Sequence, residues 1–336
     1  MTGEPILAAR DLRVTMTSHR GRIRVVDGVS FAVPHGQALG LVGESGGGKS
    51  MTLKAILGLL PQGAAVTGGS IRFQDTELLA LTDAQRNDVR GASIGMVFQE
   101  PMTALNPVMP VVDQIAEGPL AHLRLGRREA YRRALTVMSM VGIPDPARRG
   151  RAYPHEFSGG MRQRVVIAIA LSCEPRLILC DEPTTALDVT VQDQILTLLR
   201  ELTSELGMSL VYVSHDLAVV AQLCEQVAVM YAGRIVEVGA VDEVFGRPRH
   251  PYTASLLRAV PDVDDVRESL VAIPGSPPDL AQPPPGCRFH PRCEYRRADC
   301  ADGDVVLRLT ADGRGTACLY PDVLDSVPHD ITGSPT

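Results

Sequence analysis

The pattern of apolar and polar positions predicts a chain in which strands alternate with helices. Short apolar runs separated by turns predict strands across residues 1–40, the last of them at Ala38–Val42. Apolar side chains then recur at the spacing of a helix, at Leu53, Ile56, Leu57 and Leu60. Pro61 and Gly63 are expected to end this helix. This alternation predicts an α/β fold with a parallel sheet.

Three further aliphatic runs predict buried strands of that sheet: Ile94–Phe98, Leu177–Cys180 and Leu210–Ser214. Residues 100–157 are expected to be mostly helical, with loops at Asn106–Pro110 and Ile143–Arg149. Isolated cysteines in apolar runs are expected to be small buried side chains, namely Cys173, Cys180 and Cys224.

The composition of the chain changes after about residue 246. The segment Pro274–Gly286 contains six prolines and two glycines, which predicts an extended linker or a wrapping loop. A short segment rich in cysteine follows it. We therefore expect one domain over residues 1–246 and a small extension over residues 247–336.

Bulk properties narrow the class of protein. The 336 residues are 45% hydrophobic but only 4% aromatic, so aliphatic side chains are expected to fill a sizeable core. The formal net charge of −6 argues against a broad surface for nucleic acid. No apolar stretch approaches the roughly 20 residues needed to cross a bilayer, and the first residues do not resemble a signal peptide. The chain is expected in the cytosol, or at a membrane only through partners.

Residues 43–50 fit the phosphate-loop pattern G-x4-G-K-[ST], between a predicted strand and a predicted helix. Glycines let the backbone curl so that its N–H groups face phosphate, and a helix N-terminus favours an anion. Lys49 is expected to reach the β- and γ-phosphates of ATP, and Ser50 to ligate Mg²⁺. The predicted nucleotide contacts are Gly43, Glu44, Ser45, Gly46, Gly47, Gly48, Lys49, Ser50 and Met51.

Polar residues follow each of the three aliphatic runs. Ligands of open α/β sheets bind beyond the carboxyl ends of strands, so Asp181 is expected to hold Mg²⁺ through water. Glu182 is expected to orient and polarise the attacking water. Gln99 is a candidate ligand of Mg²⁺ or of that water, and His215 is expected to donate to the γ-phosphate and brace Glu182.

Residues 157–164 read Phe-Ser-Gly-Gly-Met-Arg-Gln-Arg and resemble the Leu-Ser-Gly-Gly-Gln signature of the ABC (ATP-binding cassette) ATPases. Gln99, Thr185–Asp188 and His215 resemble that family's Q-, D- and H-loops in the right order, so the resemblance covers about residues 5–246. It implies a P-loop (RecA-like) nucleotide-binding domain with an antiparallel β subdomain and a helical subdomain at about residues 100–157.

The resemblance also implies a head-to-tail dimer, in which the signature of one subunit caps the ATP held by the phosphate loop of the other. Ser158, Gly159 and Gly160 would then meet the partner's nucleotide at a helix N-terminus. The chain departs from the family at Phe157 and Met161, and it lacks the aromatic residue on which many members stack adenine. His19 and Arg20 are the candidates for that stacking.

Three segments resemble the peptide-importer branch of the family, at residues 99–107, 250–253 and 286–293. They imply an ATPase for import of dipeptides or oligopeptides, in a branch that also includes nickel and glutathione systems. The implied partners are two transmembrane permeases gripped by residues 100–157, an extracytoplasmic substrate-binding protein and a second ATPase, expected to be a paralogue in a heterodimer. The chain would be a peripheral subunit at the cytoplasmic face of the cell membrane.

Four cysteines gather in the extension with the spacing C-x5-C-x6-C-x17-C: Cys287, Cys293, Cys300 and Cys318. Four thiolates suit a structural zinc or an iron–sulfur cluster, and the spacing matches neither short zinc ribbons nor the ferredoxin pattern. Neighbouring arginines would offset the charge of an anionic cluster, and the peptide-importer resemblance also points to [4Fe–4S]. Zinc and free thiols remain alternatives, and the expected role is structural, with redox sensing as a second hypothesis.

Two other functions stay open. A soluble ABC ATPase that acts on DNA or ribosomes would usually carry two cassettes or a long coiled-coil insertion, and the sequence contains neither. A cassette that binds ATP without hydrolysing it would not need Glu182 and His215, and both are present. The transported solute does not follow from the sequence.

Overall fold

A computed structural model describes residues 4–18, 21–185, 187–259, 272–310 and 313–324. The chain divides into two compact units. The first unit comprises Met1–Leu7, Val33–Ala38 and Arg72–Val213. The second unit comprises Ala8–Ala32, Leu39–Ile71 and Ser214–Thr336, and therefore includes both the phosphate loop and the extension.

A parallel sheet lies in the first unit, with the strand order β8 (Ser209–Ser214), β7 (Leu177–Asp181), β6 (Ile94–Val97). Every residue of β7 is buried, as expected for a strand with neighbours on both sides. The three predicted strands are therefore confirmed. The strand β6 ends one residue earlier than predicted, because its last partner pair joins Val97 to Cys180 and Phe98 is 39% exposed.

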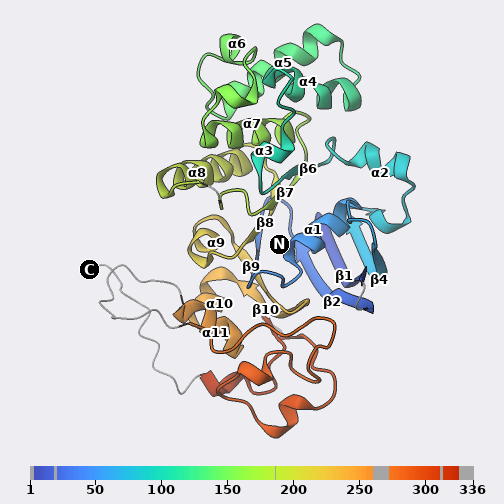
Figure 1. Cartoon of the computed structure of the whole chain (residues 1–336), viewed down its shortest axis with the longest axis vertical. Helices are drawn as coiled ribbons and strands as arrows, with labels where there is room; N and C mark the ends of the chain where they lie inside the picture. Colours follow the sequence, from blue (N-terminus) through green and yellow to red (C-terminus); the bar gives the residue numbers. More distant parts are fainter. Residues whose placement is uncertain (1–3, 19–20, 186, 260–271, 311–312, 325–336) are drawn as a thin grey trace. The chain divides into compact units, whose positions relative to one another are not determined.

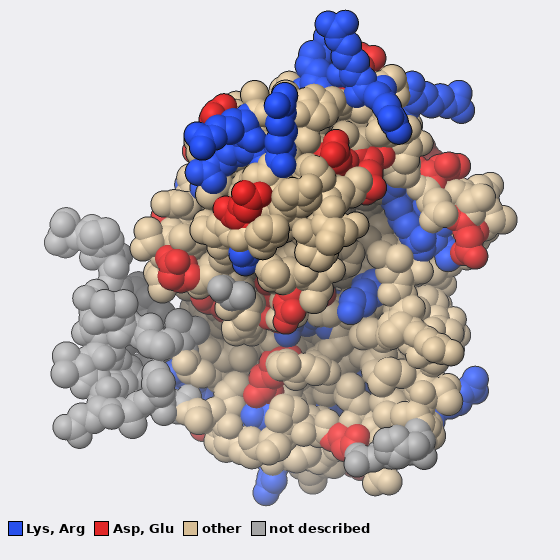
Figure 2. Space-filling model, turned by 45° about the horizontal axis from the view of Figure 1, so that its top comes forward, with Lys and Arg blue, Asp and Glu red and all other residues tan. Residues whose placement is uncertain are grey.

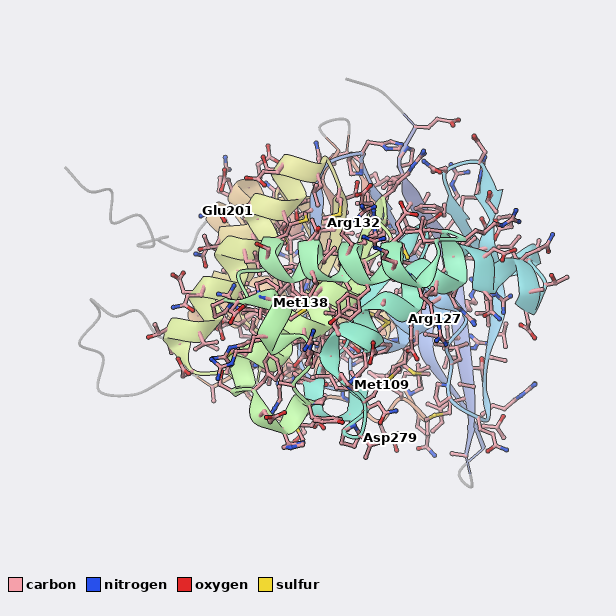
Figure 3. The ribbon with its side chains drawn as sticks, turned by 90° about the horizontal axis from the view of Figure 1, so that it is seen from above. Met109, Arg127, Arg132, Met138, Glu201 and Asp279 are labelled. Atoms are coloured by element: carbon pink, nitrogen blue, oxygen red, sulfur yellow. The ribbon has the colours of Figure 1, made fainter. Side chains whose placement is uncertain are left out.

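Helices make up most of the remainder of the first unit (Figure 1). The helix α7 (Gly159–Leu171) packs against β6, α4 (Val111–His122), α5 (Arg127–Met140) and α8 (Val189–Leu206). Figure 3 looks onto α5, along which Arg127, Arg132 and Met138 are labelled. The shorter elements are β5 (Thr76–Glu77), η1 (Leu78–Ala80), α2 (Asp83–Val89), α3 (Pro101–Ala104), α6 (Pro146–Arg149) and η2 (Pro154–Glu156).

The predicted helical region at residues 100–157 is confirmed, and Asn106–Pro110 is indeed the loop between α3 and α4. The predicted loop Ile143–Arg149 is wrong in its second half, where α6 forms. Pro146 opens that helix, and a proline suits a first turn because its φ is already helical and its missing N–H is not needed there.

The second unit contains two sets of strands. One has the order β2 (Gly21–Val33), β1 (Leu7–Ser18), β4 (Ala64–Phe73). In the other, β3 (Ala38–Val42) pairs in parallel with β9 (Gln226–Tyr231). Antiparallel pairs then follow from β9 to β10 (Arg234–Ala240), β12 (Gly315–Thr316) and β11 (Arg308–Leu309).

The helix after the phosphate loop, α1 (Lys49–Leu57), is shorter than predicted. Gly58 ends it in the left-handed region (φ 63°), where its N–H bonds back to the carbonyls of Lys54 and Ala55. Leu60 and Pro61 therefore lie beyond the helix. The other helical segments of the second unit are α9 (Leu217–Leu223), α10 (Val241–Gly246), α11 (Pro251–Arg258), η3 (His290–Arg292), η4 (Ala298–Ala301) and η5 (Pro321–Leu324).

The extension is hydrogen-bonded to strands that precede residue 246. Glu237 of β10 is the partner of Thr316 in β12, so a strand of the extension adds to the sheet of the second unit. The segment Pro274–Gly286 forms no helix or strand, as the sequence predicts. The boundary at residue 246 itself stays a prediction.

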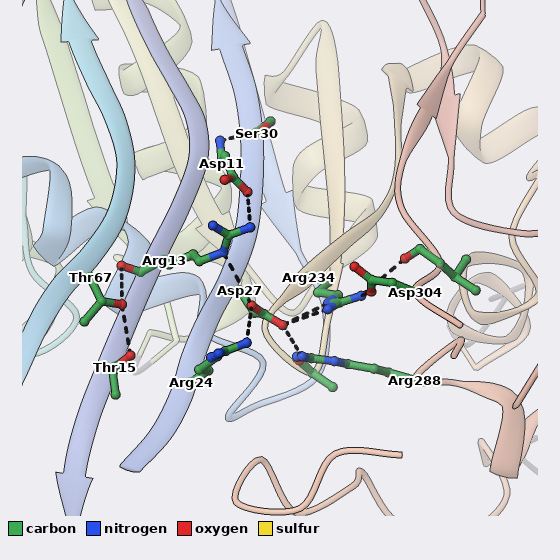
Figure 4. A network of polar contacts seen from close by, with 12 residues as sticks. Asp11, Arg13, Thr15, Arg24, Asp27, Ser30, Thr67, Arg234, Arg288 and Asp304 are labelled. Atoms are coloured by element: carbon green, nitrogen blue, oxygen red, sulfur yellow. Dashed lines mark hydrogen bonds and ion pairs between the residues drawn. The ribbon is translucent and has the colours of Figure 1, made fainter. Parts of the chain in front are cut away.

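Buried Asp27 of β2 joins the extension to the second unit's core (Figure 4). It accepts hydrogen bonds from Arg234, at 3.1 and 2.8 Å, and from Arg288 of the extension. Burial alone would raise the pKa of Asp27, but the hydrogen bond and charge of Arg234, with the charges of Arg288 and Arg24, hold that pKa below its ordinary value. Asp27 is therefore ionised at neutral pH.

Charge is unevenly distributed over the surface. Residues 122–151 contain eight arginines and two acidic residues, in a chain whose net charge is −6. Figure 2 shows Lys and Arg side chains gathered toward the top of the view. Within the described ranges, no helix is both long and apolar enough to cross a membrane.

Candidate nucleotide site

The phosphate loop begins where the fully buried strand β3 ends. Gly43, Gly46 and Gly48 have φ values of 148°, 77° and 101°. A Cβ on Gly43 would lie 2.0 Å from the carbonyl oxygen of Met230, and one on Gly48 would lie 2.4 Å from that of Val25. Close backbone packing and positive φ therefore both favour glycine at Gly43 and Gly48, whereas positive φ alone does so at Gly46.

Lys49 opens α1 and is almost completely buried under this loop. Its Nζ donates to the carbonyl oxygens of Gly43 at 2.7 Å and Glu44 at 3.0 Å. Ser45 and Gly46 are exposed at the apex, and Ser50 and Met51 are half-buried at the start of α1. The loop thus presents backbone and one cation at a helix N-terminus, which is a suitable environment for an anion.

Two carboxylates lie at the end of β7. Asp181 is buried as the last residue of the strand. Glu182 adopts a left-handed conformation (φ 47°), its N–H donates to Val213 O at 3.1 Å, and Thr185 Oγ1 donates to its Oε2 at 3.1 Å. A non-glycine residue in that region carries backbone strain, a feature that clusters at functional sites.

Gln99 lies at the same sheet edge as the carboxylates. Val97 is the partner of Cys180, so the exposed Gln99 comes two residues after β6, as Glu182 comes two residues after Cys180. The register therefore places Gln99, Asp181 and Glu182 at one edge of the sheet in the first unit.

The signature segment forms the predicted helix start. Ser158 is the N-cap of α7 and its side chain accepts from Met161 N at 3.4 Å, with Gly159 and Gly160 in the first turn. A Cβ on Gly160 would come within 2.5 Å of Val191 of α8, whereas one on Gly159 would meet no atom closer than 3.8 Å. Phe157 is buried, so an apolar side chain suffices where leucine is common.

His215 directly follows β8 and is exposed. Asp216 caps the next helix, α9, by accepting from Ala218 N at 2.9 Å. His215 and the phosphate loop belong to the second unit, while Gln99, the signature and the carboxylates belong to the first. The combination of the two sets in one site stays a prediction of the sequence.

The four cysteines of the extension line one cavity, together with His250 and Phe289. Burial, with smaller contributions from the neighbouring cysteines, raises the pKa of Cys293 to about 11 and that of Cys318 to about 12. In the part of the chain that the structure describes, no group of three or more His, Cys, Asp or Glu side chains is arranged to hold a metal ion. The described side chains are therefore not arranged as a formed metal site, and the predicted iron–sulfur cluster and its zinc alternative are not shown.

Comparison with known proteins agrees with these features. The ABC transporter family matches residues 26–185, and the C-terminal region of the oligopeptide/dipeptide transporter family matches residues 236–300. The dipeptide transport ATP-binding protein DppD of Bacillus subtilis is 49% identical over 95% of this chain and 96% of its own length. The chain belongs to the ABC transporter ATP-binding proteins of the oligopeptide/dipeptide type.

Other members of this family are nearly as similar. The oligopeptide transport ATP-binding protein OppD of Escherichia coli is 45% identical over 95% of this chain and 94% of its own. Among solved structures, the dimeric ATP-binding cassette MJ0796 bound to ADP and phosphate is 28% identical with a TM-score of 0.63, over 70% of this chain and 98% of that one. CbiO1 of Clostridium perfringens has the same identity and TM-score, over 72% and 91%. The predicted fold class, a P-loop ABC cassette, is confirmed.

Sequence reasoning assigned no role to two buried residues of this ABC protein, His250, which it used only as part of the segment 250–253, and Gln163. His250 is fully buried, caps α11 by accepting from Tyr252 N at 3.0 Å, and places Nε2 3.9 Å from Cys287 Sγ; burial lowers its pKa to about 3. Gln163 of α7 is also fully buried, and neither its Nε2 nor its Oε1 has a hydrogen-bond partner within the described structure. Gln163 stands between Arg162 and Arg164 in the sequence, so no local pattern indicated that its side chain is buried. His19 and Arg20, the candidates for adenine stacking, lie outside the described residues.

Proposed function

We propose that this chain is the ATP-binding and ATP-hydrolysing subunit that powers import of dipeptides and oligopeptides through an ABC transporter. The observation that carries the proposal is the 45–49% identity to dipeptide and oligopeptide transport ATP-binding proteins over about 95% of the chain. The match to the C-terminal region of that transporter family supports it, because it extends beyond the cassette that all ABC proteins share.

In this proposal the loop Gly43–Ser50 binds the triphosphate of ATP through its N–H groups, with Lys49 on the β- and γ-phosphates. Ser50, Gln99 and Asp181 offer the hydroxyl, amide and carboxylate oxygens that suit Mg²⁺. The ion, when bound, neutralises charge that develops on the phosphates.

Glu182 acts on the attacking water in the same proposal. The turn at φ 47° sets the direction in which the Glu182 side chain leaves the backbone. The hydrogen bond from Thr185 then holds one oxygen of its carboxylate. A held carboxylate suits a general base, which must be within hydrogen-bond reach of the proton it removes. His215 donates to the γ-phosphate. These roles assign hydrolysis to this chain rather than ATP binding alone.

We propose that the working unit is a dimer of this chain with a paralogous ATPase. Ser158, Gly159 and Gly160 at the N-terminus of α7 would cap the nucleotide of the partner, since a helix N-terminus favours anionic phosphate. Two transmembrane permeases, contacted by residues 100–157, and an extracytoplasmic binding protein complete the assembly. The chain then lies at the cytoplasmic face of the membrane as a peripheral subunit.

We also propose that Cys287, Cys293, Cys300 and Cys318 hold a [4Fe–4S] cluster rather than zinc. All four thiols line one cavity, and a cluster binds each cysteine through a different iron atom, whereas a zinc ion needs all four sulfurs about 2.3 Å from one point. When bound, the cluster would cross-link the extension. Anaerobic purification tests this: iron and the brown cluster absorption are expected, and their absence contradicts the proposal.

ATP hydrolysis by the assembled transporter tests the assigned base. Glu182→Gln is expected to lower turnover by about 100-fold or more, because general base catalysis contributes about that much. Glu201→Gln on the exposed face of α8 is the matched control and is expected to keep wild-type turnover. Unchanged hydrolysis by Glu182→Gln would show that Glu182 is not the base.

A further inference from the structure

The second residue of the phosphate loop is held by a side chain from the extension. Arg292 donates from Nη1 to Glu44 Oε2 at 2.7 Å and from Nη2 to Glu44 Oε1 at 3.1 Å. Only 5% of the Arg292 side chain and 25% of the Glu44 side chain are exposed. A two-point ion pair fixes orientation as well as distance, so it holds the Glu44 side chain in one direction.

The backbone of Glu44 is held from the same side. Its N–H donates to the hydroxyl of Tyr252 at 2.8 Å, and Tyr252 is fully buried in α11. The carbonyl of Glu44 in turn accepts from Lys49. Contacts that fix Glu44 therefore act on the backbone and the lysine that are proposed to bind ATP.

Arg292 also belongs to the cysteine-bearing segment. Cys293 directly follows Arg292 in the sequence. The guanidinium of Arg292 donates to Tyr231 Oη at 3.2 Å and to Pro274 O at 2.8 Å. These contacts leave the guanidinium little freedom. Burial alone would lower the pKa of Arg292, but its hydrogen bonds to Glu44 and Tyr231 raise that pKa above the ordinary value.

A cluster of three aromatic rings connects the cysteine cavity with the phosphate loop. Tyr231, Tyr252 and Phe289 have ring centroids 4.4–5.3 Å apart. Phe289 lines the cavity of the four cysteines. Tyr231 and Tyr252 line a second cavity beside residues 44–47. The three packed rings therefore form a continuous contact from the cysteine cavity to the cavity beside the phosphate loop.

We propose that Arg292 is a positioning residue of the phosphate loop, through which the cysteine-bearing extension sets the affinity of this chain for ATP. The inference rests on the proposed binding of ATP at this loop. Arg292 acts through Glu44: without it, a partly buried carboxylate would remain uncompensated beside the groups that bind phosphate, where its charge opposes the negative charge of ATP.

Nucleotide binding by the full-length chain tests this inference. Arg292→Ala is expected to weaken ATP binding by about tenfold, the effect of one charge-assisted hydrogen bond. Arg292→Lys is expected to lose less affinity for ATP than Arg292→Ala, because lysine keeps the charge but not the two-point geometry. Arg296→Ala, at an exposed arginine of the same segment, is the matched control and should bind ATP as the wild type does. In the assembled transporter, Arg292→Ala should raise KM for ATP and leave kcat unchanged.

A double variant separates positioning from a general loss of structure. In a Glu44→Gln background the uncompensated charge is gone, so adding Arg292→Ala should change ATP affinity by less than about twofold. A full tenfold loss in that background overturns the inference, as does equal affinity of Arg292→Ala and the wild type. If the wild-type chain binds no ATP, the proposed function fails instead.

Discussion

Asp27 shows how this protein accommodates a buried charge. It is 5% exposed and lies near four arginines, of which Arg234 and Arg288 donate hydrogen bonds to it (Figure 4). The residues of this network are up to 261 positions apart in the sequence. The similar pair of Glu44 and Arg292 is 248 positions apart. Motif spacing could predict the phosphate loop itself, but it gives no information on which distant arginine supports it.

The depressed pKa of Asp27 predicts a pH dependence of stability. Because that pKa is below the ordinary value of 3.8, the unfolded state binds more protons, and the stabilisation is complete above pH 3.8 and lost as pH falls through the lower folded value. Urea unfolding at several pH values should show that the free energy of unfolding falls less steeply toward acid pH for Asp27→Asn than for the wild type. The variant should also be less stable at pH 7, by about 3 kcal/mol, because two arginines lose a buried anion. Identical acid dependence would contradict this account.

Gln163 gives a second prediction at this scale. Its buried amide has no hydrogen-bond partner among the described residues, and such a group costs about 1–3 kcal/mol. Gln163→Leu keeps a similar volume without the polar atoms, so it should raise the free energy of unfolding of the isolated chain. Gln194→Leu at an exposed position of α8 serves as the control. A loss of stability in Gln163→Leu would mean that the amide is satisfied.

Among the secondary-structure elements, local signals predicted the existence of helices and strands better than their ends. Aliphatic runs identified β6, β7 and β8, and the Ser-Gly-Gly sequence identified the start of α7. Local backbone chemistry decided the ends that were missed: Gly58 ends α1 early, and Pro146 starts α6 inside a predicted loop. The two-residue strand β12 could not be predicted, because it is defined by its pairing with β10 and β11 and not by a local sequence pattern.

The packing of α7 on α8 predicts different effects for the two signature glycines. Gly160→Ala would place Cβ 2.5 Å from Val191 Cγ1, while Gly159→Ala meets nothing closer than 3.8 Å. Overpacking costs about 1–3 kcal/mol, so thermal unfolding should show Gly160→Ala destabilised and Gly159→Ala within about 0.5 kcal/mol of the wild type. Equal stability of the two variants would contradict the contact between these helices.

On the scale of the whole molecule, the function was predicted more from family resemblance than from the hydrophobic pattern. The phosphate loop, carboxylates and signature indicate an ATP-binding cassette, and the comparisons establish that family. The substrate class depends on the extension and on overall identity to peptide transport proteins. Partners and the proposed dimer could not be derived from one chain, because each proposed ATP site takes its signature from another subunit.

Peptide uptake by cells tests the central proposal most directly. In the organism that encodes this chain, deletion of its gene should abolish ATP-dependent uptake of a labelled dipeptide or oligopeptide. The wild-type gene and Glu201→Gln should restore uptake, and Glu182→Gln should not, although the variant protein is made to the same level. Uptake that persists without the gene, or that Glu182→Gln restores fully, would contradict the account.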